Sequence, residues 1–110
     1  MNVKFTARRF RAHPDIKEHA LETVKKLDRY CDGIVTAEII LSYERVTKSI
    51  KMAEINIHVH GAVLTARGKS EDFIKSIDAA GEKQEMQLAK YKTKRRGKNK
   101  GKVREMKESE

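Results

Sequence analysis

Apolar and polar residues alternate in several short stretches of the chain, and this is the pattern of strands with one buried face. From Asn2 to Ala7 every second residue is apolar, and Ile55, Ile57 and Val59 repeat the pattern among polar neighbours. A period of two places one side of such a sheet on a core and the other in water. Four strands are expected, over residues 2–7, 35–44, 52–59 and 63–67, with polar residues 45–50 and a turn at 61–62 joining the last three.

Between the first two strands, apolar residues recur at helical spacing. Pro14 suits the first position of a helix, because its missing amide and fixed backbone angle cost nothing there. The helix is expected to end at Asp32 and Gly33, since glycine readily adopts the left-handed conformation that closes a helix. Its apolar residues fall within an arc of about 80°. They are Ile16, Ala20, Val24, Leu27 and Cys31.

A second helix is expected near the C-terminal end. In this prediction Gly68 and Lys69 break the last strand, and the hydroxyl of Ser70 is the N-cap. Glu71 and Asp72 then lie in the first turn, where carboxylates suit the helix dipole. One arc of this helix is apolar except for Gln84, and it holds Phe73, Ile77, Ala80, Leu88 and Tyr91.

The predicted order of elements is strand, helix, strand, strand, strand, helix. A right-handed crossover through the first helix allows both helices to cover the same face of the sheet. The chain is therefore predicted to be an α+β protein. We expect a two-layer sandwich of β-α-β-β-β-α order, with a four-stranded sheet and two helices on one face.

Composition and charge add a basic tail to this picture. The 110 residues suffice for one domain, and their net charge is +9. Residues 92–110 hold nine Lys and Arg against three acids, with too few apolar residues for a core. We predict a folded domain over residues 1–95 and a disordered basic tail over residues 96–110. The lone Cys31, and the lack of a membrane span or secretory signal, favour a cytoplasmic protein with no membrane partner.

Charges are segregated on the second helix. Lys83, Lys90 and Lys94 project within about 40° of one another along roughly 16 Å of helix, whereas Asp78, Glu82 and Glu85 occupy the other flank. A solvated surface would normally mix the two signs to gain pair energies, so segregation favours binding to the phosphates of RNA. Two further groups of cations are candidates for RNA contact or for simple solvation: Lys25, Lys26 and Arg29 on the first helix, and Arg8, Arg9 and Arg11 after the first strand.

Other chemistry finds little support. His58 and His60 share one strand face, but two imidazoles do not complete a metal site, so we expect no metal and no cofactor. No nucleophile has the context of a catalytic triad, and no glycine-rich phosphate loop follows a strand. We therefore expect no enzyme and no small-molecule substrate. Phe5, Phe73 and Tyr91 hold core-facing positions, which disfavours recognition of RNA by base stacking.

Four stretches of the sequence resemble one known family: HPDIKEHA at 13–20, GAVLTARGKSED at 61–72, SIDAA at 76–80 and EKQEMQLAKYKTK at 82–94. From Asn2 to Lys94 the chain is similar to the ribosome hibernation-promoting factors, also called ribosome-associated inhibitors or ribosomal subunit interface proteins. The resemblance implies the same fold and docking between the head and body of the small ribosomal subunit. It also implies that the cations of both helices face ribosomal RNA, namely Lys83, Lys90, Lys94, Lys25, Lys26 and Arg29.

The sequence leads to the hypothesis of a non-enzymatic translation inhibitor. It would bind the RNA of the small ribosomal subunit in the 70S ribosome, block the mRNA and tRNA channel, and promote ribosome hibernation in stressed or stationary-phase cells. The alternatives are a protein-binding transcriptional regulator, acting through the helices or the exposed sheet face, and a metal-dependent enzyme at His58 and His60. Long members of the family carry a further C-terminal domain, so the chain resembles the short class or the N-terminal part of a longer product.

Overall fold

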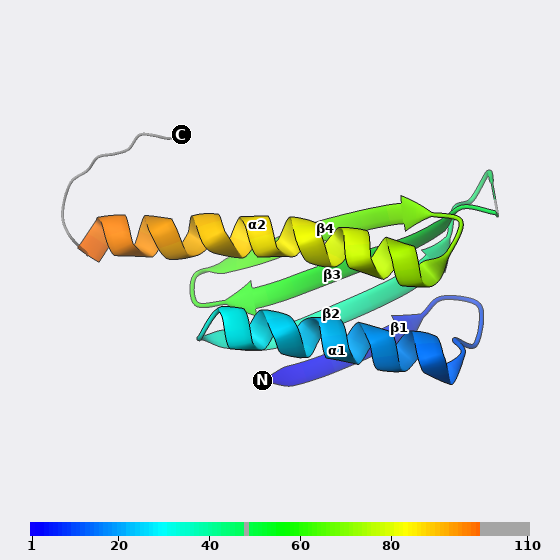
Figure 1. Cartoon of the computed structure of the whole chain (residues 1–110), viewed down its shortest axis with the longest axis horizontal. Coiled ribbons are helices and arrows are strands. Elements are labelled where there is room, and N and C mark those ends of the chain that lie inside the picture. The colour runs from blue at the N-terminus through cyan, green and yellow to red at the C-terminus, as the bar shows by residue number, and fades with distance from the viewer. Residues whose placement is uncertain (48, 100–110) are drawn as a thin grey trace.

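The chain folds as two layers, a sheet and a pair of helices (Figure 1). The structure, a computed structural model, describes residues 1–47 and 49–99, with side chains described as far as Thr93. The elements are β1 (Asn2–Ala7), α1 (Pro14–Tyr30), β2 (Ile34–Tyr43), β3 (Lys51–Val59), β4 (Ala62–Ser70) and α2 (Phe73–Asn99). The predicted α+β fold and its order of elements are confirmed.

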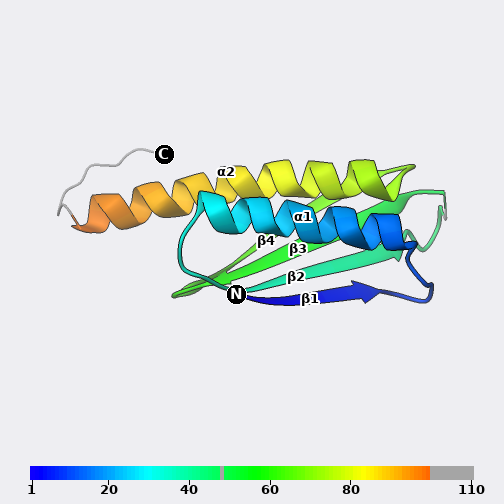
Figure 2. The same ribbon diagram turned by 60° about the horizontal axis from the view of Figure 1, so that its bottom comes forward.

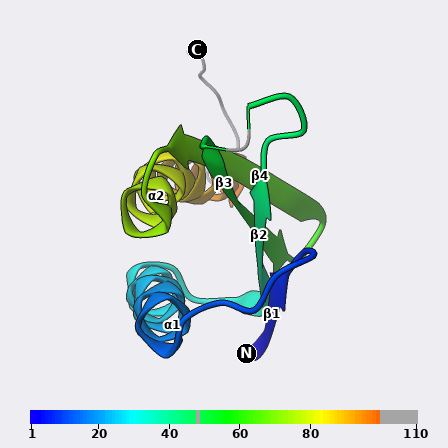
Figure 3. The same cartoon turned by 90° about the vertical axis from the view of Figure 1, so that its right-hand side faces the viewer.

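The four strands lie in the order β1-β2-β3-β4. β1 is parallel to β2, because the chain returns through α1 before it enters the sheet again, whereas β3 and β4 follow as antiparallel hairpins. Both helices cover the same face of this sheet, and the other face is uncovered (Figures 2 and 3). The alternation of apolar and polar residues along the strands thus corresponds to the covered and the uncovered face of the sheet.

The core forms where the apolar stripe of α1 meets the covered face of the sheet. Val24, Leu27 and Cys31 are almost fully buried, and so are the larger inward residues of β2 and β3. Those strand residues are Ile39, Leu41, Ile55 and Ile57. Burying a side chain of this size stabilises the fold by about 1.5–3 kcal/mol, so these positions supply much of the driving force for folding.

The predicted ends of α1 are also confirmed. Pro14 occupies the first turn, and the ring of His13 accepts a hydrogen bond from the amide of Asp15 at 3.2 Å. At the other end, Cys31 closes the helix and Gly33 adopts a φ of 92°, a conformation that glycine enters without steric cost.

The prediction for the start of α2 is wrong. β4 continues through Gly68 and Lys69 to Ser70, and Asp72 is the residue that caps the helix, accepting from the amide of Ile74 at 2.8 Å. Gly68 is needed for packing: a Cβ there would lie 2.2 Å from the carbonyl oxygen of Ser76. The glycine lets α2 approach the backbone of the sheet. Residue 68 is therefore a packing position inside β4 and does not end the strand.

Gln84, the polar residue on the apolar arc of α2, is completely buried. Its Nε2 donates to the carbonyl oxygens of Ile55 and Leu64, both at 2.7 Å. Its Oε1 is buried without a hydrogen-bond partner among the described residues, so the donor half of this amide is satisfied and the acceptor half is not. Gln84 therefore ties α2 to the backbones of β3 and β4 in place of an apolar contact.

α2 continues well past the sheet, and its C-terminal part extends beyond both the β3–β4 turn and α1 (Figure 1). It runs to Asn99, past the predicted domain boundary at residue 95. Residues 100–110, the rest of the predicted basic tail, lie outside the described residues, so the tail stays a prediction. Within the described part of the chain, no helix is long and apolar enough to cross a membrane.

Candidate nucleic-acid interface

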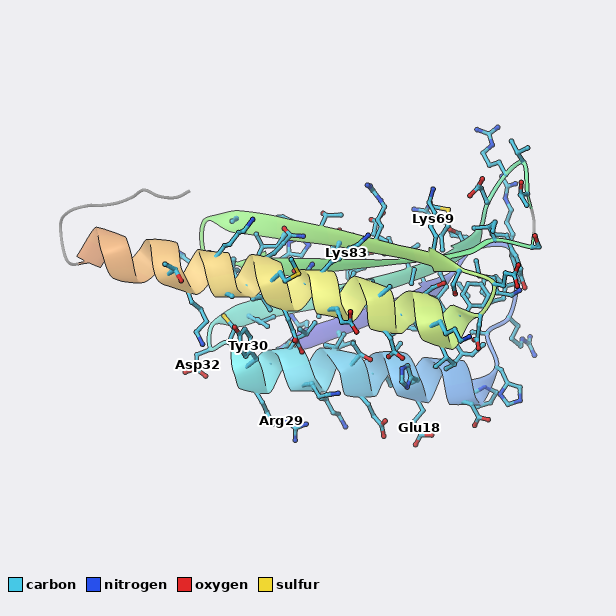
Figure 4. The ribbon with its side chains drawn as sticks, turned by 45° about the horizontal axis from the view of Figure 1, so that its top comes forward. Glu18, Arg29, Tyr30, Asp32, Lys69 and Lys83 are labelled. Atoms are coloured by element: carbon cyan, nitrogen blue, oxygen red, sulfur yellow. The ribbon has the colours of Figure 1, made fainter. Side chains whose placement is uncertain are left out.

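Lys83 is exposed on the flank of α2 that borders β4 (Figure 4), and Lys90 is exposed on the same helix. The Nζ of Lys83 reaches across to β4 and donates to the carbonyl oxygen of Arg67 at 2.8 Å. Lys90 lies two turns further along the helix on the same flank. We call Lys83, Lys90 and Lys94 the lysine edge; the backbone of Lys94 continues the helix, and its side chain lies outside the described residues.

Lys83 and Gln87 also cover part of the open side of the sheet. β4 is an edge strand, and the side chain of Gln87 donates to the carbonyl oxygen of Thr65 as Lys83 does to that of Arg67. Unpaired backbone groups on an edge strand invite association with other chains. Sequence reasoning missed this role, because it depends on which residues of β4 lie opposite α2.

The acidic flank of α2 faces α1, on the side of the helix away from the lysine edge. Glu82 and Glu85 line a cavity of about 290 Å³ between the two helices, together with Asp78 and the α1 residues Thr23, Lys26 and Leu27. The helices approach closely here because residue 81 is glycine, whose Cβ would lie 2.8 Å from Cγ2 of Thr23. Separation of the two signs is thus a feature of the folded molecule.

The cavity between α1 and α2, which we call the inter-helix groove, is bordered by a further polar contact. Nε2 of His19 on α1 lies 2.6 Å from Oδ1 of Asp78 on α2. Lys26, a predicted RNA contact, lines the same groove as the carboxylates of Glu82 and Glu85. Its surroundings are therefore acidic, unlike those of the lysine edge.

The other predicted cations of α1 lie on its solvent side. Lys25 and Arg29 are exposed, and Arg29 points away from the body of the protein, as Glu18 does on the same helix (Figure 4). Glu22 is exposed as well. This face mixes both signs, so its potential is weaker than that of the lysine edge.

Lys92 joins the ends of the two helices, a role that the sequence did not suggest. Its Nζ donates to the carbonyl oxygen of Tyr30 at 3.1 Å and lies 4.5 Å from the centre of the Tyr30 ring. The last carbonyls of a helix lack partners inside it, and a cation is favourable there. Lys92 thereby fixes α2 against the C-terminal end of α1.

Arg8, Arg9 and Arg11 are all exposed at the opposite end of the molecule from Lys92. Arg8 follows β1, where its amide still pairs with Leu41 at 2.9 Å. Arg9 has a φ of 64°, the left-handed conformation. The structure therefore separates the predicted cations into the lysine edge, the mixed face of α1, the inter-helix groove and this end, and their binding of RNA stays a prediction.

The uncovered face of the sheet carries a polar network centred on Glu54. Asn56 and Arg67 donate to its two carboxylate oxygens, each at 2.8 Å, and Thr65 donates to Asn56 at 2.7 Å. The hydrogen bond from Asn56 lowers the pKa of Glu54 most; Arg67 and the charge of Arg8 lower it further, and burial opposes them. Among the described residues, no three His, Cys, Asp or Glu side chains are grouped so as to hold a metal ion.

This network predicts a dependence of stability on pH. Because the pKa of Glu54 is lowered in the folded state, its contribution is present above the unfolded pKa and is lost as pH falls through the folded pKa. We expect Asn56→Ala to raise the pKa of Glu54 and to flatten the loss of stability below about pH 4.5. Urea unfolding across the acid range measures the loss, with Asn2→Ala as an exposed control; an unchanged acid dependence would contradict the assignment.

Solved structures of known proteins share this fold. A ribosomal subunit interface protein from Coxiella burnetii aligns with a TM-score of 0.74 and 25% identity, over 84% of this chain and 99% of its own. The N-terminal domain of Protein Y from Thermus thermophilus aligns with a TM-score of 0.71 and 26% identity, over 83% of this chain and 99% of its own. The chain thus shares its fold with a ribosomal subunit interface protein and with the N-terminal domain of Protein Y.

The sequence places the chain in a family. Residues 3–96 match the family model described as Sigma 54 modulation protein / S30EA ribosomal protein, and the chain belongs to this family. The ribosome hibernation promoting factor of Klebsiella oxytoca is 29% identical over 86% of this chain and 96% of its own length, and that of Azotobacter vinelandii is 28% identical over 86% and 85%. The chain spans 50% of the longer Bacillus subtilis factor, at 29% identity. The resemblance stated from the sequence is confirmed.

Proposed function

We propose that this protein is a non-enzymatic ribosome hibernation factor that binds the RNA of the small ribosomal subunit in the mRNA and tRNA channel. Family membership and the names of the relatives support the association with ribosomes. The lysine edge supports RNA as the contact, since the exposed side chains of Lys83 and Lys90 share one flank of α2 while the acids of that helix face α1.

The physical basis of this binding is electrostatic. RNA phosphates attract exposed amines and release counterions when they are bound, which gives affinity that falls steeply with salt. A row of amines on a rigid helix keeps a fixed spacing, so little order has to be created on binding. Part of the aromatic content fits this mode of recognition, because Phe73 is buried in the core and Phe10 packs against it, whereas Tyr30 and Tyr43 are exposed.

Sedimentation with purified subunits tests the proposal. We expect the protein to co-sediment with small subunits and with 70S ribosomes, but not with large subunits, and to be displaced as potassium concentration rises. Bound protein should also lower the amount of mRNA retained by small subunits, because both would occupy the same channel. Equal binding to large subunits, or retention of mRNA that does not change, would contradict the proposal.

A protein-binding regulator is the second candidate. The family description includes modulation of sigma 54, and the groove between α1 and α2 is lined by Asp78, Glu82 and Glu85, which would repel RNA. Nuclease treatment of a cell-extract complex separates the two functions. RNA digestion should release a protein held by ribosomal RNA, whereas a complex with a protein partner should survive it.

A further inference from the structure

Three arginines from two loops lie at one end of the molecule. Arg9 and Arg11 belong to the β1–α1 loop and Arg45 to the β2–β3 hairpin, and both loops leave the sheet at the same end (Figures 1 and 3). All three side chains are exposed, and within the described part of the chain none forms a hydrogen bond or an ion pair. Nothing in the sequence pattern joined Arg45 to the other two.

An aromatic cluster holds the two loops together. The ring of Phe10, between Arg9 and Arg11, stacks on Phe73 at a centroid distance of 5.0 Å and meets Tyr43 edge-on at 5.1 Å. Tyr43 ends β2, two residues before Arg45. The β1–α1 loop is therefore anchored at the base of the hairpin, at the end of the sheet where Arg45 follows β2.

The backbone of this loop is strained at an arginine. Arg9 has a φ of 64°, which is uncommon for a residue other than glycine or asparagine. The turn it makes brings Phe10 back to the aromatic cluster. Glycine would make the same turn without strain, so an arginine at this position has no advantage for folding.

Three acids at this end are already engaged, whereas Glu71, beside Asp72, is exposed at the same end. Glu44 lies 3.8 Å from the amine of Lys69, Asp15 lies 3.6 Å from the ring of His13, and Asp72 accepts from the backbone at the start of α2. The three guanidinium groups thus have exposed donors and no carboxylate partner among the described residues. Guanidinium donors are arranged as a fork that matches the oxygens of a phosphate.

We infer that Arg9, Arg11 and Arg45 form a second phosphate-binding site for RNA, the arginine end, separate from the lysine edge. Measured along α2 from Phe73, which contacts Phe10, Lys83 lies roughly 15 Å away and Lys90 roughly 26 Å. The arginine end therefore contacts phosphates that lie beyond those bound by the lysine edge. The inference rests on the proposed function and adds a second contact surface to it.

A triple variant tests the arginine end in the full-length protein. We expect Arg9→Gly, Arg11→Gln and Arg45→Gln together to lower the affinity for a fluorescein-labelled RNA hairpin, and to reduce the slope of log affinity against log salt by about 2 to 3. The control Lys4→Gln, Lys17→Gln and Lys75→Gln removes the same charge from other exposed positions. We expect it to change the slope by less than about 1. Equal slopes for the two variants would overturn the inference.

Two further measurements separate the possible failures. Arg9→Gly alone should weaken RNA binding. It should leave the melting temperature equal to or above that of the wild type, because glycine relieves the backbone strain at this position. A lower melting temperature with unchanged RNA binding would overturn the site. If the triple variant binds the hairpin as the control does but loses ribosome co-sedimentation, the partner of the arginine end is a protein, and the RNA assignment is wrong. Failure of the proposed function would instead show as wild-type protein that does not bind ribosomes.

Discussion

Changing the lysine edge should release the protein from ribosomes. We expect the variant Lys83→Gln, Lys90→Glu and Lys94→Glu to bind small subunits about 100-fold more weakly or worse, since each lost phosphate contact removes about 1 kcal/mol and each new carboxylate adds repulsion. Glutamine is chosen at residue 83 because an amide can still donate to the carbonyl oxygen of Arg67, which Lys83 now does. Co-sedimentation over a salt series measures the change.

The matched control changes the net charge of the protein by the same amount at positions outside the lysine edge. Lys4→Glu, Lys75→Glu and Lys17→Gln lie at exposed positions on β1, α2 and α1. We expect this control to keep most of the affinity, and both variants to keep the circular dichroism spectrum and melting temperature of the wild type. If the two variants lose ribosome binding equally, total charge determines the affinity and the lysine edge has no special part in it.

Gly68→Ala should lower the free energy of unfolding more than the other single substitutions, Asn56→Ala, Arg9→Gly and Gly61→Ala. Its Cβ would lie 2.2 Å from the carbonyl oxygen of Ser76 and 2.8 Å from the amide nitrogen of Ala80, both in the backbone of α2. Backbone atoms cannot swing aside as side chains do, so the helix must move off the sheet and the contacts of the core are lost with it. We expect a loss of about 3 kcal/mol or more in the free energy of unfolding, measured by urea denaturation.

Gly61→Ala is the control for this substitution. Gly61 has a φ of 82° in the β3–β4 turn, and a Cβ added there would have no atom within 4 Å. An alanine at this position costs about 1–2 kcal/mol of backbone strain and no packing. Similar losses for the two variants would mean that glycine conformation, and not the approach of α2 to the sheet, is what residue 68 provides.

The elements and the layers could be predicted from the sequence because local periodicity reports burial. The stripe from Ile16 to Cys31 and the alternation in β1 and β3 each have one apolar side, and the covered sheet face is where those sides meet. Pro14 and Gly33 marked the ends of α1 for reasons of backbone geometry that act within a few residues. The separation of acids and lysines on α2 could also be predicted, because residue spacing sets the direction of each side chain on a helix.

The end of β4 could not be predicted, because it depends on contacts distant in the sequence. Residue type alone predicts a break at Gly68, while its real constraint is the backbone of Ser76 across the helix–sheet contact. Gln84 likewise is out of place on an apolar arc in the sequence, and only the fold brings the carbonyl oxygens of Ile55 and Leu64 within its reach. In both cases the partner atom belongs to another element.

The sequence by itself determined the order of elements, the buried face of each, the family and the presence of a lysine row on α2, since all of these follow from residue type and spacing. Only the tertiary structure decided that this row borders β4 while the acids of α2 face α1, and that Arg45 joins Arg9 and Arg11 at one end. The reason is physical: spacing along a chain sets the direction of a side chain on its own element, but neighbours from other elements are set by how the elements pack.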